Sequence, residues 1–190
     1  MVDCYETERL LLRVLGEPDS RAVCDFYWRN KEYFEPFEPE RLPGFYTPEF
    51  HRQSLAAERF QYEQRRYLRL YLFLKEKPEL VIGSVCFDNI RFGSFQSCTL
   101  GYKMDKDFQR QGYMLEALIY SLKNIIFKEY GLHRVEALAV PENTASLHLL
   151  ERLGFEKEGV SRDFARLCGV WRDHVRYALI NYDAAPCSNG

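Results

Sequence analysis

The chain has 190 residues, 46% of them hydrophobic, which suits one globular domain with a substantial core. Its 26 lysines and arginines against 28 aspartates and glutamates give a net charge of −2, which argues against broad electrostatic binding of nucleic acid. The N-terminal stretch carries charges every few positions, unlike a signal peptide, and no stretch reaches the ~18 apolar residues of a membrane span. We expect a cytoplasmic protein with no membrane partner and no direct nucleic-acid partner.

The cysteines and histidines give no sign of a disulfide or metal site. No C-x-x-C pair occurs, and the histidines lack the spacing of metal ligands. We expect no metal, and free thiols that are mostly buried. The cysteines are Cys4, Cys24, Cys86, Cys98, Cys168 and Cys187.

The N-terminal part of the chain predicts a strand and a helix before a proline-rich connection. Arg9 to Val14 has the apolar pattern of a strand, and Glu17-Pro18-Asp19-Ser20 is typical of a helix start. Four prolines between residues 30 and 48 predict an irregular segment. Its aromatic residues, which lie among glutamates, either line a substrate cleft or pack on the core. A second helix is expected from Pro48 to about Arg66.

The rest of the chain predicts an antiparallel meander and then alternating helices and strands. This order indicates an α/β protein (α+β, mixed sheet) rather than a bundle or a sandwich. We expect one domain over residues 1–183 and a disordered tail over 184–190. The expected strands are 68–75, 80–90, 96–104, 134–140, 156–167 and 170–182, and the expected helices are 112–129 and 143–152.

The stretch FQRQGYMLEALIYSL places a glycine and polar side chains at the mouth of a helix. Apolar residues recur at helical spacing from Met114 onward, so the helix begins near Gly112. Free amides and the positive end of the helix dipole bind anions, and a glycine lets a phosphate approach the backbone. The dinucleotide and P-loop fingerprints are both absent from the sequence. The stretch is therefore either a cradle for the pyrophosphate of another cofactor or a simple loop-to-helix turn.

Two motifs resemble the GNAT family of acetyl-CoA-dependent N-acetyltransferases. The run QRQGYM fits the family's cofactor loop, Q/R-x-x-G-x-G/A, except that Met114 replaces the small last residue. Further on, PENTASLHLLERLGFEKEG is similar to the second signature, in which N-x-x-A/S opens a helix that ends in a G-F pair. The resemblance extends from Glu8 to about Tyr182. It is strongest to the ribosomal-protein-alanine N-acetyltransferases of the RimJ/RimL type, RimJ in particular, through GSFQSCTLGYKM and GVWRDHVRYAL.

The resemblance implies a GNAT acyl-CoA N-acyltransferase fold, with a central, mostly antiparallel sheet that splays open at the cofactor site. Pantetheine is expected beside the backbone of the strand that ends near Met104, with the pyrophosphate on the amides of the following loop. Asn143, which also suits a helix N-cap, is expected across the gap. The cofactor-binding residues implied are Tyr102, Lys103, Met104, Gln109, Arg110, Gln111, Gly112, Tyr113, Met114, Leu115, Asn143 and Ser146.

The implied reaction is attack of a neutral amine on a thioester, and the leaving thiolate benefits from a proton donor. Many GNAT enzymes supply that proton from a tyrosine on the second helix. This chain has Leu150 there, so the role is assigned to the hydroxyl of Ser146 or to a water. Related enzymes can carry a carboxylate where this chain has Thr99, so the base stays open. Other carboxylates are candidates for orienting the amine or for relaying its proton through water, Glu38 first and Asp88 second.

The lack of an assigned general base limits which amines can act as the acetyl acceptor. An α-amino group with a pKa of about 7.7 is neutral in roughly one molecule in six at pH 7, whereas fewer than about one lysine in a thousand is neutral. A site without a strong base is therefore better suited to N-terminal amines than to lysines. Together with this, the resemblance implies acetyl-CoA-dependent N-α-acetylation of the N-terminal alanine of a basic protein, a small-subunit ribosomal protein, by direct attack on the thioester. Two alternatives stay open: acetylation of a small-molecule amine, such as a polyamine or an antibiotic, and a non-catalytic acetyl-CoA-binding ribosome-assembly factor.

Overall fold

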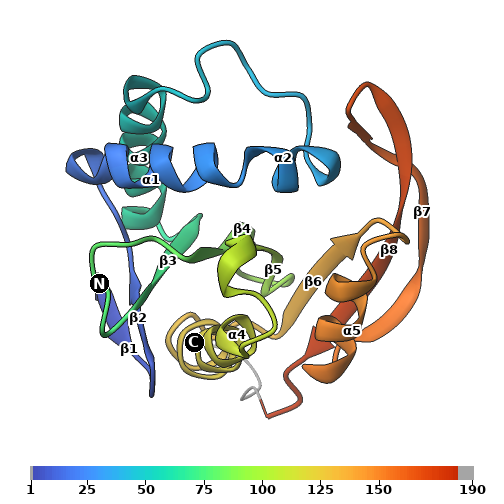
Figure 1. The fold of residues 1–190 in the computed structure, drawn as a ribbon. Helices are drawn as coiled ribbons and strands as arrows, with labels where there is room; N and C mark the ends of the chain where they lie inside the picture. Colours follow the sequence, from blue (N-terminus) through green and yellow to red (C-terminus); the bar gives the residue numbers. More distant parts are fainter. Residues whose placement is uncertain (1, 184–190) are drawn as a thin grey trace.

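One eight-stranded mixed sheet organises residues 2–183, the part of the chain that the computed structural model describes (Figure 1). The strands, in their order across the sheet, are β1 (Cys4–Glu6), β2 (Leu10–Arg13), β3 (Leu68–Leu74), β4 (Gly83–Arg91), β5 (Ser97–Met104), β6 (Arg134–Ala139), β8 (Val170–Ile180) and β7 (Glu156–Leu167). Neighbouring strands are antiparallel except for β5 and β6, which run parallel. The mixed, mostly antiparallel sheet flanked by helices is therefore confirmed.

Helices cover both faces of this sheet (Figure 1). They are α1 (Ser20–Arg29), α2 (Lys31–Phe34), α3 (Pro48–Glu63), α4 (Tyr113–Tyr120), its π-helical continuation Ser121–Glu129, and α5 (Thr144–Arg152). Leu70 and Leu72 of β3 pack in the core beneath α4, whereas Tyr71 and Phe73 pack in a second core with α1 and α3. Successive strand residues point to opposite faces, so a strand buried on both faces has a nearly continuous apolar sequence, as LRLYLFLK does.

The parallel pair β5 and β6 forms a fork in the sheet. The two strands pair from Ser97 and Arg134 as far as Leu100 and Ala137, and then they separate. The other edge of β5 stays paired with β4 up to Met104. Helix α4 follows β5 and helix α5 follows β6, so both helices begin at the open end of the fork. We use "fork" below for this opening between the carboxyl-terminal ends of β5 and β6.

Three local features differ from the sequence prediction. Strand β1 was not predicted. The proline-rich segment is not irregular throughout, because it contains α2 and a 3-10 turn over Glu35–Phe37. Pro36 is compatible with that turn, since the first positions of a helical turn do not need their N–H groups. The predicted helix over 112–129 continues from α4 into a π-helix.

The cysteines of the described residues are free, as predicted. The prediction that most are buried is wrong, because only Cys24 and Cys98 are buried, while Cys4 and Cys168 are exposed. Cys187 and the predicted tail over 184–190 lie outside the described residues. Within residues 2–183, the helices are all too short or too polar to cross a membrane, and no group of three acidic, histidine or cysteine side chains could hold a metal.

Candidate functional site

A cavity of about 550 Å³ opens at the fork. Its walls come from the end of β5, the first turn of α4, the first turns of α5, and the segment around α2. All the predicted cofactor-binding residues line it except Gln111, whose exposed side chain donates a hydrogen bond to the carbonyl of Asp107 at 3.2 Å. The side chain of Glu38 lines the same cavity. The structure thus gathers residues from distant parts of the chain around one space.

The start of α4 has the geometry of an anion site. Gly112 is the N-cap and has a φ of +80°, in the left-handed region that favours glycine. The first hydrogen bond of the helix runs from the N–H of Glu116 to the carbonyl of Gly112, at 3.0 Å. The three amides before Glu116 therefore project from the helix end beside the cavity, where an anion is favoured by both hydrogen bonding and the helix dipole.

Arg9, which directly precedes β2, holds this loop in place, and the sequence analysis did not identify it as a site residue. Its Nε atom lies 2.6 Å from a carboxylate oxygen of Glu116, and its Nη1 donates to the carbonyl of Gln111 at 3.0 Å. Its guanidinium also lies 4.5 Å from the ring centre of Tyr113. Burial alone would raise the pKa of Glu116, but hydrogen bonds from Thr7 and Arg9 outweigh it and hold the pKa below its usual range. Glu116 is thus part of the loop's support.

A buried carboxylate fixes the other end of the same loop. Asp105, directly after β5, is fully buried and accepts hydrogen bonds from Nε of Arg29 at 2.7 Å and from the side-chain amide of Asn30 at 2.9 Å. The side chain of Asn30 in turn accepts a hydrogen bond from the amide of Lys106 at 3.0 Å. The end of α1 therefore anchors the chain where β5 leaves the sheet. No sequence motif pointed to these residues, because they are paired only through the fold.

Two hydroxyl groups meet across the fork. Asn143 caps α5 as predicted, with its side-chain oxygen accepting a hydrogen bond from the amide of Ser146 at 3.1 Å. The hydroxyl of Ser146 lies 2.8 Å from the phenol oxygen of Tyr102, which comes from β5. Burial raises the pKa of Tyr102 to about 12, so its phenol stays protonated at neutral pH. Leu150, at the position where many family members have a tyrosine, is 1% exposed and lies in the core.

Glu38 reaches the cavity as part of an ion-pair group. One of its oxygens lies 2.5 Å from Nζ of Lys103, and the other lies 3.1 Å from a guanidinium nitrogen of Arg41. The side chain is 17% exposed. Glu38 therefore lies at the cavity with both of its oxygens paired to cations, and its role there stays a prediction.

A second hollow, of about 750 Å³, adjoins the first at Glu38, which lines both. It lies between the proline-rich segment and the turn of the β7–β8 hairpin. Glu35 and Glu40 also line it, and the thiol of Cys168 in the hairpin turn donates to the carbonyl of Glu35 at 3.2 Å. Of the aromatic residues in the segment, Phe34 is buried and Phe45 packs against that core. The segment thus packs on the core and also lines a hollow, and binding of a substrate in that hollow stays a prediction.

Known proteins are similar to this chain in both sequence and fold. A sequence model described as an acetyltransferase (GNAT) domain matches residues 9–156. The [ribosomal protein uS5]-alanine N-acetyltransferase of Escherichia coli (strain K12) is 34% identical over 180 residues, covering 95% of this chain and 92% of that protein. The ribosomal-protein-S5-alanine acetyltransferase of Vibrio fischeri superposes with a TM-score of 0.90 at 30% identity, over 96% of this chain and 99% of the other. Mycobacterium smegmatis RimJ in complex with CoA-disulfide shares the fold, with a TM-score of 0.85 at 24% identity.

Proposed function

Because the chain belongs to the GNAT family and is an N-acetyltransferase, we propose that it transfers the acetyl group of acetyl-CoA to a protein N-terminus. The proposed acceptor is the N-terminal alanine of a small-subunit ribosomal protein, and the proposed setting is the cytoplasm. The observation that carries the proposal is the cavity at the fork, where the amides of α4, the open edge of β5 and the Tyr102–Ser146 pair line one space.

The donor side of the proposal rests on the backbone. The amides at the start of α4 suit the pyrophosphate, and Arg110 adds a positive charge at the same edge. The edge of β5 from Gly101 to Met104 has no neighbouring strand on its β6 side within residues 2–183, so its peptide groups are available to the amides of pantetheine. An N–H group of this edge near Met104 would stabilise the oxyanion that forms when the amine attacks.

The acceptor side rests on charge and on shape. The larger hollow adjoins the fork cavity at Glu38. It carries Glu35, Glu38 and Glu40 beside Lys31 and Arg41, an excess of one carboxylate, which favours a basic polypeptide along it. Glu38, whose oxygens are already paired with Lys103 and Arg41, is proposed to orient the incoming neutral amine by accepting a hydrogen bond from its N–H group. Relatives whose names specify ribosomal-protein alanine as the acceptor support the same choice.

Ser146 and Tyr102 are proposed to supply and position the proton that the leaving thiolate needs. When the tetrahedral adduct collapses, the C–S bond breaks and the thiolate needs a proton or a hydrogen-bond donor. The two hydroxyl oxygens lie 2.8 Å apart and either can donate. In the arrangement that we propose, the phenol of Tyr102 donates to the oxygen of Ser146, and the Ser146 hydroxyl proton is then free to point at the sulfur. This arrangement makes Ser146 the proton donor and Tyr102 the residue that orients it.

An acceptor panel tests the proposal. Thiol release from acetyl-CoA would be measured with basic peptides that begin with Ala, Ser or Met, with the same peptides blocked at the N-terminus but carrying free lysines, and with spermidine. We expect turnover only with free N-termini, because a substantial fraction of α-amines is neutral near pH 7. We expect the fastest turnover with Ala, because alanine is the acceptor named for the relatives.

The other outcomes separate the alternatives. Turnover with spermidine alone would keep the enzyme class and reject the protein acceptor. Turnover with blocked peptides would make lysine the acceptor. No turnover with any amine, while acetyl-CoA still raises the melting temperature of the protein, would favour a non-catalytic binding protein.

A further inference from the structure

A third hollow, of about 470 Å³, lies where the end of α3 passes beside the end of β4 and the start of β5. This is the end of β5 opposite the fork, and the strand spans about 24 Å between Ser97 here and Met104 at the fork. The hollow shares no lining residue with the two hollows described above. The residues that line it are Gln61, Arg66, Asn89, Ile90, Arg91 and Thr99.

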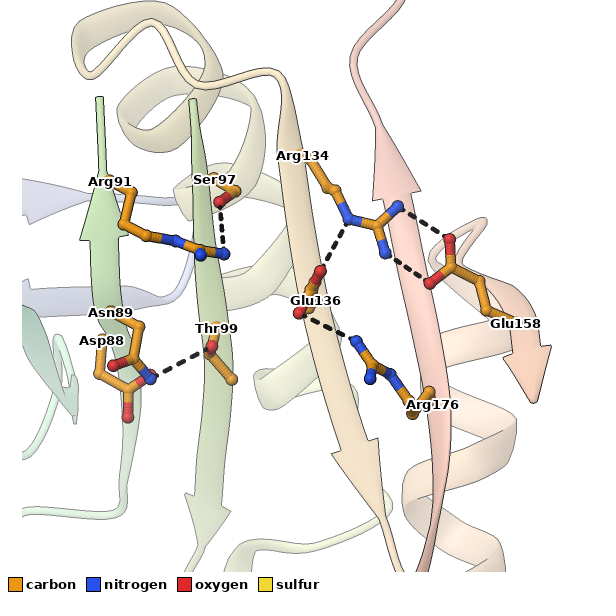
Figure 2. Close-up of polar contacts among 9 residues, drawn as sticks. All are labelled: Asp88, Asn89, Arg91, Ser97, Thr99, Arg134, Glu136, Glu158 and Arg176. Atoms are coloured by element: carbon orange, nitrogen blue, oxygen red, sulfur yellow. Dashed lines mark hydrogen bonds and ion pairs between the residues drawn. The ribbon is translucent and has the colours of Figure 1, made fainter. Parts of the chain in front are cut away.

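Two arginines and no carboxylate line this hollow. Within residues 2–183, the side chain of Arg66 has no hydrogen bond, ion pair or ring contact, and Arg91 has no ion-pair partner. Nη2 of Arg91 donates to the hydroxyl of Ser97 at 3.1 Å, as Figure 2 shows. Arginines without a carboxylate partner are available to an anion, and the planar guanidinium group suits a phosphate in particular.

Neutral polar side chains complete the walls of the hollow. The register between β4 and β5 shifts between Asp88 and Arg91, and Asn89 has a φ of +48°, in the left-handed region. The side-chain amide of Asn89 donates to a carboxylate oxygen of Asp88 at 3.0 Å and lies 3.4 Å from the hydroxyl of Thr99 (Figure 2). Asp88, the second carboxylate predicted from the sequence, lines neither this hollow nor the cavity at the fork. The amides and the hydroxyl of the walls can both donate and accept hydrogen bonds, as sugar hydroxyls require.

Two exposed phenylalanines lie beside the hollow, at the turn between β4 and β5. Phe92 is 44% exposed and Phe95 is 64% exposed. The guanidinium carbon of Arg65 lies 5.6 Å from the ring centre of Phe92, and that of Arg91 lies 4.6 Å from the ring centre of Phe95. Each ring therefore has an arginine on one side and exposed area that is open to a further flat group.

The end of α3 positions the arginines beside this turn. The helix closes with the N–H of Arg66 donating to the carbonyl of Gln61 at 3.0 Å, and Arg65 before it has a φ of +56°. Glycine is the residue usually found at this left-handed position, so an arginine there strains the backbone. The guanidinium of Arg65 also lies 4.6 Å from the ring centre of Tyr130, which fixes it between that ring and Phe92.

The combination of charge and aromatic surface indicates the kind of partner. The phosphates of a polynucleotide pair with arginines, and its bases stack on aromatic rings and on guanidinium planes. An acidic peptide would leave the rings without flat partners, and an apolar partner would bury Arg66 without a counter-charge. Bases within a duplex are already stacked on one another, so a single strand fits better. The net charge of −2 argues against binding over the whole surface, but it does not bear on a local cluster of cations.

We propose that a surface consisting of Arg65, Arg66, Arg91, Phe92 and Phe95, the β4–β5 patch, binds single-stranded RNA. A phosphate occupies the hollow between Arg66 and Arg91, and neighbouring bases stack on Phe92 and Phe95. RNA is favoured over DNA because the neutral polar walls can form hydrogen bonds with a ribose 2′-hydroxyl. The inference goes beyond the proposed function and does not depend on which amine is acetylated. Because the patch and the fork lie at opposite ends of β5, RNA and the acetyl acceptor can be bound together.

The first test measures binding of a fluorescently labelled, unstructured RNA of about 12 nucleotides by anisotropy, at salt concentrations from about 50 to 200 mM. We expect Arg66→Gln and Arg91→Gln each to weaken binding about threefold or more at the lowest salt, because each removes a phosphate contact. The slope of log K against log salt should fall by about 0.7 for each variant. Arg52→Gln is the matched control, since Arg52 lies on α3, is exposed and is paired with Glu49. It should bind RNA as the wild type does.

The second test separates stacking from charge. The double variant Phe92→Leu/Phe95→Leu keeps apolar side chains but lacks the flat rings. We expect it to bind RNA about tenfold or more weakly, with an unchanged salt slope, because stacking involves no counterion release. Phe37→Leu is the matched control, since Phe37 is 41% exposed but lines the cavity at the fork. Melting temperatures equal to that of the wild type would show that the variants are folded.

Competition identifies the ligand, and unlabelled single-stranded DNA, duplex RNA and polyglutamate should all compete less well than single-stranded RNA. Polyglutamate that competes equally, or full binding by the phenylalanine double variant, would overturn the proposal in favour of general attraction of anions. Single-stranded DNA that competes equally would overturn the choice of RNA. No binding by the wild type at the lowest salt would reject the patch altogether. Acetylation of a short peptide is expected to be the same in the patch variants as in the wild type, so these outcomes are distinct from failure of the proposed function.

Discussion

The phenol of Tyr102 and the hydroxyl of Ser146 are separated by 44 positions in the sequence and by 2.8 Å in the fold. Each fixes the hydrogen-bonding direction of the other, since a hydroxyl that accepts one hydrogen bond is free to donate along a defined direction. If they act as a unit, removing either group should cost about as much as removing both.

We therefore expect Tyr102→Phe and Ser146→Ala each to lower kcat by about tenfold or more, the scale of a lost positioned proton donor. The KM for acetyl-CoA should change little, because the backbone at the fork is unaltered. The double variant should be no slower than the slower single variant. Tyr33→Phe is the control, since Tyr33 lines the same cavity and is 42% exposed. Multiplicative losses in the double variant would show that the two hydroxyls act separately.

Residues in local motifs were predictable, and residues that act through the fold were not. Gly112 and the helix after it form one continuous stretch of sequence, so the start of the helix was predictable, and the phosphate cradle stays a proposal. The backbone role of Tyr102 came from the same kind of pattern, but its hydroxyl was missed because its partner lies on another element. Arg9 was missed for the same reason, since its contact to Gln111 spans 102 positions.

At the scale of elements, the turn between β1 and β2 is attached to α4. Arg9 and Thr7 both contact the carboxylate of Glu116, and Arg9 also holds the carbonyl of Gln111 in the proposed phosphate loop. A Cβ atom on Gly112 would lie 3.3 Å from the guanidinium of Arg9, so the arginine is packed closely against the loop backbone. The conformation of the loop therefore depends on an N-terminal segment that itself does not line the cavity at the fork.

Arg9→Met should loosen the loop while keeping the aliphatic part of the side chain. We expect the KM for acetyl-CoA to rise several-fold, with a smaller change in kcat, because the loop contributes donor binding rather than chemistry. Arg13→Met provides the control four residues further along the chain, where Arg13 of β2 lies over Phe73 and donates to the carbonyl of Pro78. An equal rise in KM for both variants would mean that the effect comes from general destabilisation.

The proline-rich segment shows the limit of element prediction from local signals. Its four prolines correctly indicated a break between two long helices, but the short α2 and the turn after it depend on tertiary packing. Phe34, at the end of α2, contacts the rings of Phe26 and Tyr27 of α1. Such contacts stabilise a single helical turn that is too short to form alone.

At the scale of the whole molecule, the mixed sheet and the order of helices and strands were predictable because the apolar patterns are long and alternate clearly. Those patterns do not specify the order of strands across the sheet, and the splay was expected only through the resemblance to the GNAT family. The structure adds the register, with four residue pairs joining β5 to β6 before they part. That register fixes which face and which residues meet at the opening.

The fork leaves the protein with an internal sheet edge, from Gly101 to Met104, that no other strand of the described chain covers. An uncovered edge is a template onto which any extended chain can add, including a second copy of the protein. On the proposed function, acetyl-CoA acts as a surrogate strand that closes this edge, so the supply of the donor would govern solubility as well as turnover. Saturation at a hundred times Kd should add about 2.7 kcal/mol to the unfolding free energy. Amide hydrogen exchange at 102–104 should slow on adding acetyl-CoA, and unchanged exchange there would place the ligand elsewhere.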